Sequence, residues 1–344
     1  MVTQNDRPHG YDFGLPPDPV SQDSAVQPDR GSRLTAGQDA GATAAAQGAG
    51  DTPLGRKLVE ENQRRRRLEH VQLQRPERTR VITVSNQKGG VGKTSTAVNL
   101  AVGLAKQGLN VLVVDNDPQG NASTALGVPH SSEVDGVYDV LVDEMELAQV
   151  VAPSPESDRI VVAPATIDLA GAEIELVSMV AREQRLSRAL DQYAKGREEQ
   201  GLERLDYVFI DCPPSLGLLT INAFVAASEV LIPIQCEYYA LEGLSQLLRN
   251  IEMIQKHLNP DLVVSTILMT MYDGRTNLSS QVADEVRAHF PEQVLETMIP
   301  RSVRISEAPS YQQSVLNYDP QSTGALSYLE AAAEIAARGV PKSK

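Results

Sequence analysis

Short runs of consecutive apolar residues recur along the chain after residue 80, and stretches with helical periodicity lie between them. The runs predict buried β-strands at VITVSN (81–86), VLVVD (111–115), RIVVAP (159–164), DYVFID (206–211), VLIPIQ (230–235), VVSTILM (263–269) and the shorter LETMIP (295–300). Helices are expected from the end of the first run to about Gln107, where Gly108 stops the helix, and around 172–193, 238–257 and 276–290. Apolar strands that alternate with helices are typical of a mostly parallel sheet covered on both faces. The pattern therefore predicts one doubly wound α/β domain over residues 79–340.

The chain before this domain shows no such pattern. Residues 1–50 contain 12 Gly plus Pro and no hydrophobic periodicity, so they cannot bury enough apolar surface to offset the entropy of ordering. From Thr52 to Arg80, nine Lys and Arg stand against four Glu, with too few apolar residues for a strong amphipathic helix. We expect residues 1–78 to form a disordered tail and a basic linker. The linker is either a solvated spacer or an arm that contacts DNA or a partner.

Composition narrows the class of protein. Of the 344 residues, 41% are hydrophobic, which is enough for a substantial core. No run of about 18 apolar residues that could cross a membrane is found, and the N-terminus lacks the apolar core of a secretory signal, so we expect a cytoplasmic protein. The two cysteines, Cys212 and Cys236, lack the number and spacing of a disulfide framework or zinc site.

The net charge of −14 is unevenly distributed. Residues 81–344 hold 19 Lys and Arg against 34 Asp and Glu, so this part of the chain carries a net charge of −15. A body that acidic repels nucleic acid. Any DNA binding therefore has to come from local basic patches.

The first motif with functional chemistry is KGGVGKTS (88–95), which follows the first predicted strand and opens the first predicted helix. This is the context that a phosphate-binding loop requires. The glycines let backbone N–H groups face phosphate oxygens, and the helix N-terminus adds partial positive charge. Lys93 would contact the β- and γ-phosphates, and the Thr94 hydroxyl would ligate Mg²⁺. The candidate nucleotide-binding residues in this motif are Lys88, Gly89, Gly90, Val91, Gly92, Lys93, Thr94 and Ser95.

Two further motifs place carboxylates at the ends of predicted strands. VLVVDNDPQGNAS (111–123) carries Asp115 and Asp117 to the edge where open α/β sheets bind their ligands. Mutual repulsion makes such a pair costly unless a cation or a water uses it. DYVFIDCPPSLG (206–217) ends an apolar strand in Asp211, which is the Walker B pattern for holding Mg²⁺ through a water.

Together these motifs resemble the deviant P-loop NTPases, whose members include ParA, MinD, the nitrogenase iron protein and the arsenical-pump ATPase. The general P-loop begins with Gly, whereas this chain has Gln87 and then Lys88, in the place of the family's signature lysine. The resemblance implies that Lys88 reaches across a sandwich dimer to the other subunit's ATP, and that Asp117 orients or activates the attacking water. It implies a supporting role near Mg²⁺ for Asp115. The implied catalytic residues are Lys88, Lys93 and Asp117, and the implied metal-site residues are Thr94, Asp115 and Asp211.

Within that superfamily the chain looks like the ParA/Soj proteins of chromosomal type. The segments that carry this likeness are YYALEGLSQLL (238–248), TMYDGRTNLSSQV (270–282) and IPRSVRISEAPSYQQSV (299–315). The likeness implies that Pro300 and Arg301 help to hold the adenine. It also implies that Arg275 and Arg304 lie on a dimer face that contacts DNA phosphates, although a structural surface role remains an alternative for both.

The ParA/Soj likeness implies an ATPase that uses ATP and Mg²⁺, forms an ATP-bound homodimer and binds double-stranded DNA without sequence preference. Its expected partner is a centromere-binding protein of the ParB type, and its expected location is the cytoplasm at the nucleoid, without membrane contact. The runner-up is a MinD-like, membrane-associated regulator of division. That alternative requires a basic amphipathic C-terminal helix, whereas LSYLEAAAEIAARGVPKSK is rich in Ala and only weakly amphipathic. An adaptor in which hydrolysis matters little also remains open.

Overall fold

The computed structural model describes residues 52–69, 71–238 and 240–339. The predicted disorder of residues 1–50 thus concerns a segment outside the described residues. Contacts divide the chain into residues 1–56 and residues 57–344, and the second unit holds the sheet. No helix among the described residues is both long and apolar enough to span a membrane.

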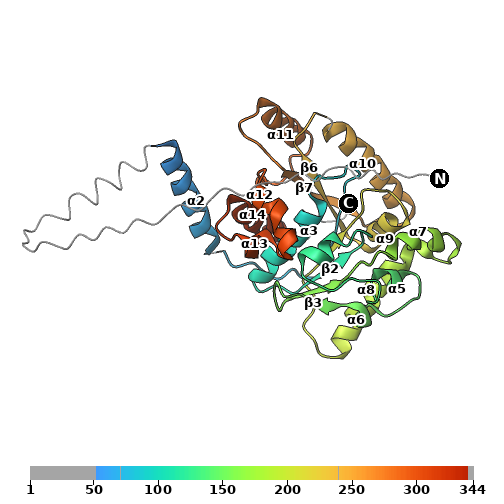
Figure 1. Cartoon of the computed structure of the whole chain (residues 1–344). Helices are drawn as coiled ribbons and strands as arrows, with labels where there is room; N and C mark the ends of the chain where they lie inside the picture. Colours follow the sequence, from blue (N-terminus) through green and yellow to red (C-terminus); the bar gives the residue numbers. More distant parts are fainter. Residues whose placement is uncertain (1–51, 70, 239, 340–344) are drawn as a thin grey trace, which may run out of the picture. The chain divides into compact units, whose positions relative to one another are not determined.

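Seven strands form one sheet in the order β3-β4-β2-β5-β1-β6-β7 (Figure 1). They are β1 (Arg80–Val84), β2 (Val111–Asp115), β3 (Ala152–Pro153), β4 (Ile160–Ala163), β5 (Tyr207–Asp211), β6 (Glu229–Gln235) and β7 (Val263–Thr270). Every pairing is parallel except that of β3 with β4, which is antiparallel. The predicted mostly parallel, doubly wound sheet is confirmed.

Helices cover both faces of this sheet. They are α2 (Pro53–Glu69), α3 (Lys93–Lys106), α4 (Asn121–Ala125), α5 (Val137–Leu141), α6 (Leu147–Val150), α7 (Leu169–Glu175), α8 (Arg185–Glu199), α9 (Leu218–Ala226), α10 (Ala240–His257), α11 (Asn277–His289), α12 (Val303–Glu307), α13 (Val315–Tyr318) and α14 (Thr323–Arg338). Alternation along β2 divides the core, because successive side chains point to opposite faces. Val111 and Val113 join the cluster built with α3 and α14, whereas Leu112 and Val114 join the cluster built with α8 and α9.

Two predicted elements differ in the structure. Residues 295–300 form no strand. Isolated bridges join Val294 to Ile267 and Pro300 to Tyr272, and between them the N–H groups of Glu296 and Thr297 donate to the carboxylate of Glu334 instead of to a neighbouring strand. The helix expected over 172–193 is interrupted between α7 and α8, where Ala181 has a left-handed φ of 51°.

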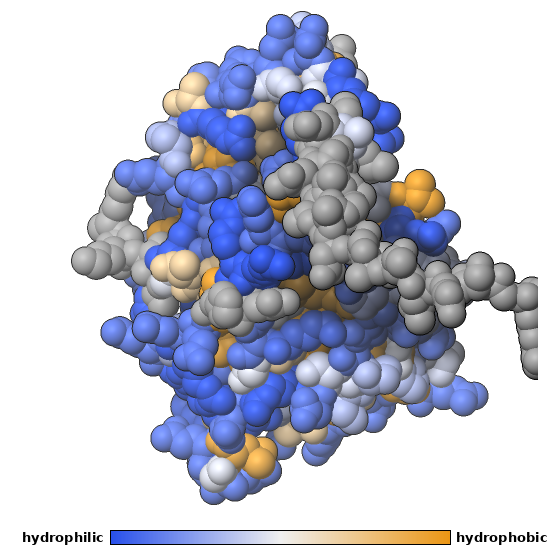
Figure 2. Space-filling view, turned by 90° about the vertical axis from the view of Figure 1, so that its left-hand side faces the viewer, coloured by the Kyte–Doolittle hydropathy of each residue, from blue (hydrophilic) through white to orange (hydrophobic). Residues whose placement is uncertain are grey.

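The basic linker also differs from expectation, because residues 53–69 form the helix α2. The half-buried side chains on its inner face are Glu61, Arg64, Arg65 and Leu68. Arg64 pairs with Glu330 of α14, Glu61 accepts a hydrogen bond from Thr323 at 2.8 Å, and Arg65 donates to the carbonyls of residues 320 and 321. The helix is therefore attached by charged and polar contacts rather than by an apolar stripe, which is why hydrophobic periodicity did not reveal it. Figure 2 looks onto the side of the molecule on which α2 is drawn in Figure 1, and its uncovered surface is largely hydrophilic.

A buried ion pair stabilises the packing at the start of β1. The Arg80 side chain is 2% exposed, and its Nε and Nη2 each donate at 2.7 Å to one carboxylate oxygen of Glu229 at the start of β6. Its Nη1 donates to the carbonyl of Ile335 in α14 at 2.7 Å, and its guanidinium lies over the ring of Tyr207 at 5.4 Å. One side chain thus ties β1, β5, β6 and α14 together.

We expect Glu229→Ala to lower the free energy of unfolding by about 3–5 kcal/mol, because it leaves the Arg80 guanidinium buried without a counter-charge. Glu183→Ala is the matched control, since the pair of Arg182 with Glu183 is 37% and 28% exposed and should be worth at most about 1 kcal/mol. Urea denaturation of the three proteins measures both values. A loss below about 1 kcal/mol for Glu229→Ala would contradict the importance given to this pair.

Candidate nucleotide-binding site

The loop of residues 88–92 leaves the central strand β1 and enters α3 at the carboxyl edge of the sheet. Gly90 and Gly92 have left-handed φ values of 75° and 85°, and Gly92 is the N-cap residue of α3. Side chains at these two positions would be strained. A Cβ added at Gly89 or Gly90 would meet no atom within 4 Å, so the loop borders open space. Strand, loop and helix thus stand in the order that the motif predicted, with room for phosphate above the loop.

Lys93 lies under this loop. Its side chain is largely buried, and Nζ lies 3.5 Å from the carbonyl oxygen of Lys88. Burial lowers the pKa of Lys93, while the carboxylates of Asp211 and Asp117 oppose that shift. The ammonium is therefore held between the phosphate loop and the acidic strand ends.

Asp115, at the end of β2, is fully buried and hydrogen-bonded to its own loop. Oδ2 accepts hydrogen bonds from the backbone N and the Oγ of Ser123, both at 2.7 Å, and Oδ1 accepts from the backbone N of Asp117 at 3.3 Å. Burial raises the pKa of Asp115 to about 6, although the Ser123 hydrogen bonds act in the opposite direction. With three hydrogen bonds already made, this carboxylate is suited to fixing the loop 116–123 rather than to direct metal contact.

Asp211 is in the opposite situation. It ends β5, between β1 and β2, and stands in register with Asp115. Both of its carboxylate oxygens are buried and lack a hydrogen-bond partner among the described residues. Burial and the negative charge of Asp115 raise the pKa of Asp211 well above its ordinary value, against the opposing effects of Thr94 and Lys93. An unpaired buried carboxylate is rare enough to need an explanation.

Magnesium fits this arrangement. Mg²⁺ usually keeps several waters and takes one or two protein carboxylates together with the phosphates of its nucleotide. No cluster of three or more His, Cys, Asp or Glu that could enclose a metal occurs in the described part of the chain. A site with Thr94, the free oxygens of Asp211 and a nucleotide phosphate therefore matches the donor set that Mg²⁺ prefers.

Asp117 lies two residues beyond β2. Its side chain is largely buried, and Oδ1 accepts a hydrogen bond from the backbone N of Gln119 at 3.1 Å. Its negative charge acts on Lys93. The structure thus brings Lys93, Asp115, Asp117 and Asp211 to one edge of the sheet.

The side chain of Lys88 contacts a residue of its own chain. Its side chain is 46% exposed and forms an ion pair with Glu237, which follows β6 and is equally exposed. The loop is held at this end by a hydrogen bond of 3.0 Å from the Lys88 backbone N to the Oδ1 of Asn86.

The candidate adenine residues reach the same edge through β7. Pro300 forms a bridge with Tyr272, and the backbone N of Arg301 donates to the Tyr272 carbonyl at 3.1 Å. At the end of β7, the Oγ1 of Thr270 donates to the carbonyl of Val91 at 2.8 Å. The segment 299–301 is thus linked to the phosphate loop through the end of one strand.

The two candidate DNA-binding arginines lie outside this site, and each is paired with acidic side chains. Arg275 is 89% exposed and its guanidinium contacts the carboxylate of Asp273 at 2.7 and 2.8 Å, which lowers the pKa of Asp273 to about 2. Arg304, in α12, lies 3.2 Å from Glu307 and 3.4 Å from Asp319. Phosphate binding at either position has to displace these carboxylates.

Two residues of the site were not found from the sequence. Ser123 fixes Asp115 and also accepts a hydrogen bond from the backbone N of Ala165 at 3.1 Å, and Thr270 joins β7 to the phosphate loop. The only signal for Ser123 was its place in the second motif. Thr270 begins the segment 270–282, but nothing in the sequence indicated its contact with the phosphate loop, because that contact joins residues 179 positions apart.

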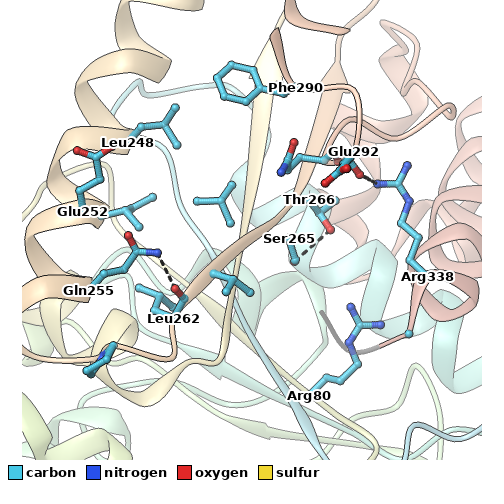
Figure 3. A pocket seen from close by; sticks show the side chains of 16 residues that line it. Arg80, Leu248, Glu252, Gln255, Leu262, Ser265, Thr266, Phe290, Glu292 and Arg338 are labelled. Atoms are coloured by element: carbon cyan, nitrogen blue, oxygen red, sulfur yellow. Dashed lines mark hydrogen bonds between the residues drawn. The ribbon is translucent and has the colours of Figure 1, made fainter. Parts of the chain in front are cut away.

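A cavity of about 980 Å³ lies at the opposite end of the strands, between α10, β7 and the end of α14 (Figure 3). Three of its polar side chains are already engaged: Arg80 with Glu229, Gln255 with the carbonyl of Leu262, and Arg338 with Glu334. The cavity is separate from the phosphate loop, and none of its described lining side chains has a buried polar atom without a hydrogen-bond partner.

A protein-family model described as an AAA domain matches residues 79–264. The chain is 52% identical over 260 residues to the sporulation initiation inhibitor protein Soj of Bacillus subtilis (strain 168), which covers 76% of this chain and 99% of that protein. It is 49% identical over 264 residues to the chromosome partitioning protein ParA of Myxococcus xanthus (strain DK1622), and the match covers 77% of this chain and 90% of that protein. The crystal structure of cobyrinic acid a,c-diamide synthase from Mycobacterium smegmatis with bound ATP analog and magnesium has a TM-score of 0.62 and 38% identity, covering 74% of this chain and 93% of that one.

We expect Asp211→Asn to increase the free energy of unfolding of the nucleotide-free protein by about 1–3 kcal/mol at pH 8, because it removes an unpaired buried charge. The raised folded-state pKa means that Asp211 lowers stability above its unfolded pKa, and that this loss shrinks as falling pH protonates the folded carboxyl. The gain from the substitution should therefore diminish toward pH 5. Urea titrations at both pH values measure it, with the exposed Asp284→Asn as the charge-matched control. Destabilisation at pH 8 would show that Asp211 is satisfied in the free protein.

Proposed function

This chain belongs to the Soj/ParA family of chromosome-partitioning proteins, and from that premise we propose that its ATP-bound dimer binds DNA and releases it on hydrolysis. Family membership makes the chain an ATPase that uses ATP and Mg²⁺. The observation that carries the proposal is the gathering of the phosphate loop, the buried Lys93 and the unpaired carboxylate of Asp211 at one edge of the sheet.

The nucleotide lies with its phosphates over the loop 88–95, where backbone N–H groups and Lys93 bind the phosphate oxygens. Thr94 and Asp211 would hold Mg²⁺, the latter through a water, and the ion would supply positive charge against the phosphates. Asp115 keeps the loop after β2 in place through Ser123. Pro300 and Arg301 contact the adenine, and their connection to Val91 through Thr270 supports a common site for base and phosphates.

Hydrolysis depends on positioning more than on covalent chemistry. Asp117 orients the attacking water, and its place beside the buried Lys93 supports this role. Lys88 leaves Glu237 and reaches across the dimer to the partner subunit's ATP. Turnover stays slow until a centromere-binding protein of the ParB type completes the site. The protein thereby takes part in the segregation of a chromosome or plasmid.

DNA binding without sequence preference follows from phosphate contacts. A monomer whose residues 81–344 carry a net charge of −15 attracts DNA poorly. Dimerisation places two copies of Arg275 and Arg304 on one face, which doubles the phosphate contacts at nearly fixed geometry. ATP binding thus controls DNA binding and, with it, association with the nucleoid.

We expect Asp117→Ala to bind ATP and to dimerise but to hydrolyse ATP at least about tenfold more slowly, because the residue that orients the water is gone. Lys93→Ala should lose ATP binding and dimerisation together, because it lacks the charge that binds the phosphates. Phosphate release and size-exclusion chromatography with ATP separate the two. Hydrolysis at the wild-type rate by Asp117→Ala would refute the role given to Asp117.

We expect Arg304→Ala to lower the slope of log K against log salt for ATP-dependent DNA binding by about 2 per dimer, since each dimer loses two phosphate contacts. Arg188→Ala, on the exposed side of α8, is the control for a change in charge alone. The slope is measured by titrating double-stranded DNA at several salt concentrations. ATP-dependent binding to anionic liposomes instead of DNA would favour the MinD-like alternative.

A further inference from the structure

The helix α2 is attached to the domain on one side only. Arg64 donates at 2.9 Å from Nε to an oxygen of Glu330 and at 3.2 Å from Nη2 to Ser327, both of which belong to α14. Arg65 donates to the carbonyls of Pro320 and Gln321 at 3.1 and 2.6 Å. These contacts fix the rotation of α2 about its own axis. They therefore determine which side chains face outward.

The attachment places α2 next to Arg304. Residues 319–321 form a short bridge between the two, because Asp319 pairs with Arg304 while the next two carbonyls accept hydrogen bonds from Arg65. Figure 1 shows α2 beside α14, with α12 and α13 at the same end of the domain. The basic helix and the candidate DNA-binding arginine thus belong to one continuous surface.

The outward side of α2 carries hydrogen-bond donors. Asn62, Gln63, Arg66 and Arg67 are all exposed and lie opposite the inner face at helical spacing. Neither Arg66 nor Arg67 forms an ion pair with any side chain that the structure describes, in contrast to Arg275 and Arg304. Their charge is therefore free to act on a ligand without first displacing a carboxylate.

We propose that α2 is a second DNA-binding element, which adds Arg66 and Arg67 to the surface of Arg304 and contacts backbone phosphates. The inference rests on the proposed function, because it extends the same DNA-binding face. Two copies in the dimer contribute four further cationic side chains. They compensate part of the acidity of the domain, whose residues 81–344 carry a net charge of −15.

DNA is a better match for this side of α2 than an acidic protein. Arg, Asn and Gln are the side chains that contact phosphate and sugar oxygens in protein–DNA complexes. Protein interfaces centre instead on buried aromatic and apolar anchors. Among the described side chains of α2, the exposed large apolar ones are Leu58 and Val59, which are 52% and 49% exposed and lie together near the start of the helix rather than beside Arg66 and Arg67. Glu60 is also exposed on this helix, one turn before Gln63, but the two arginines outnumber it, and a net positive set of donors next to Arg304 is suited to a polyanion.

The first experiment measures the salt dependence of DNA binding by the full-length protein with ATP. We expect the double variant Arg66→Ala, Arg67→Ala to lower the log–log slope by about 2 to 4 per dimer, according to whether one or both arginines of each subunit contact phosphate. The control Arg188→Ala, Lys195→Ala removes the same charge from the exposed side of α8 and should keep the slope. A slope equal to the wild-type value in the α2 variant overturns the proposal and leaves an acidic protein as the ligand of α2.

The second experiment separates the docking of α2 from its charge. Glu330→Ala removes the partner of Arg64 and makes the protein more positive by one charge, so a general charge effect predicts equal or tighter DNA binding. The proposal predicts weaker binding, because an undocked α2 no longer presents its arginines beside Arg304. Glu199→Ala on α8 is the charge-matched control. Unchanged or tighter binding by Glu330→Ala contradicts the proposal.

ATP-dependent dimerisation, followed by size-exclusion chromatography, shows that each variant keeps its nucleotide site. A wild-type protein that does not bind DNA with ATP refutes the proposed function itself. A wild-type protein that binds DNA, together with α2 variants that bind with the same slope and affinity, refutes only the role of α2.

Discussion

The buried carboxylate of Asp211 is the constraint around which the site is organised. Parallel strands bring Asp211, Asp115 and the phosphate loop to one edge, and the apolar core beneath them excludes the water that would solvate these charges. Asp115 is satisfied by the loop that it holds, whereas the carboxylate of Asp211 has no hydrogen-bond partner among the described residues. The free protein is therefore destabilised at the place where a cation and phosphates would restore balance. Ligand binding and folding stability are coupled through this one residue.

Several of the candidate ligand-binding cations are paired with carboxylates of the same chain. Lys88 pairs with Glu237, Arg275 with Asp273, and Arg304 with two carboxylates. These paired cations act only on a ligand that competes with the internal carboxylates. Arg66 and Arg67 of α2 are exposed and form no ion pair with a described side chain, as is also the case for Arg188 and Lys195 of α8, so what distinguishes the α2 arginines is their place beside Arg304.

Much of the fold was predictable because it follows from local patterns. The apolar strands, the glycine loop and the α3 stop at Gly108 are written in contiguous residues, and they place Lys93 and the three aspartates at one edge without knowledge of the tertiary structure. What could not be predicted depends on contacts between distant residues. The carboxylate of Glu334 captures the N–H groups of residues 296 and 297 and prevents a strand there. Likewise, the docking of α2 depends on the pairing of Arg64 with a residue 266 positions away, for which hydrophobic periodicity gives no signal.

The half-exposed ion pair of Lys88 with Glu237 affects the free energy of the proposed dimerisation, because Lys88 has to leave Glu237 before it can reach the other subunit. An ion pair at that exposure is worth at most about 1 kcal/mol, so its rupture disfavours the trans position of one lysine by no more than about fivefold. Two such ruptures in a symmetric dimer multiply to about thirtyfold. That penalty is too small to forbid assembly of the proposed dimer, and it raises the protein concentration needed for assembly by up to the same factor. In the proposed dimer, Glu237 would thus help to set the protein concentration at which two subunits assemble.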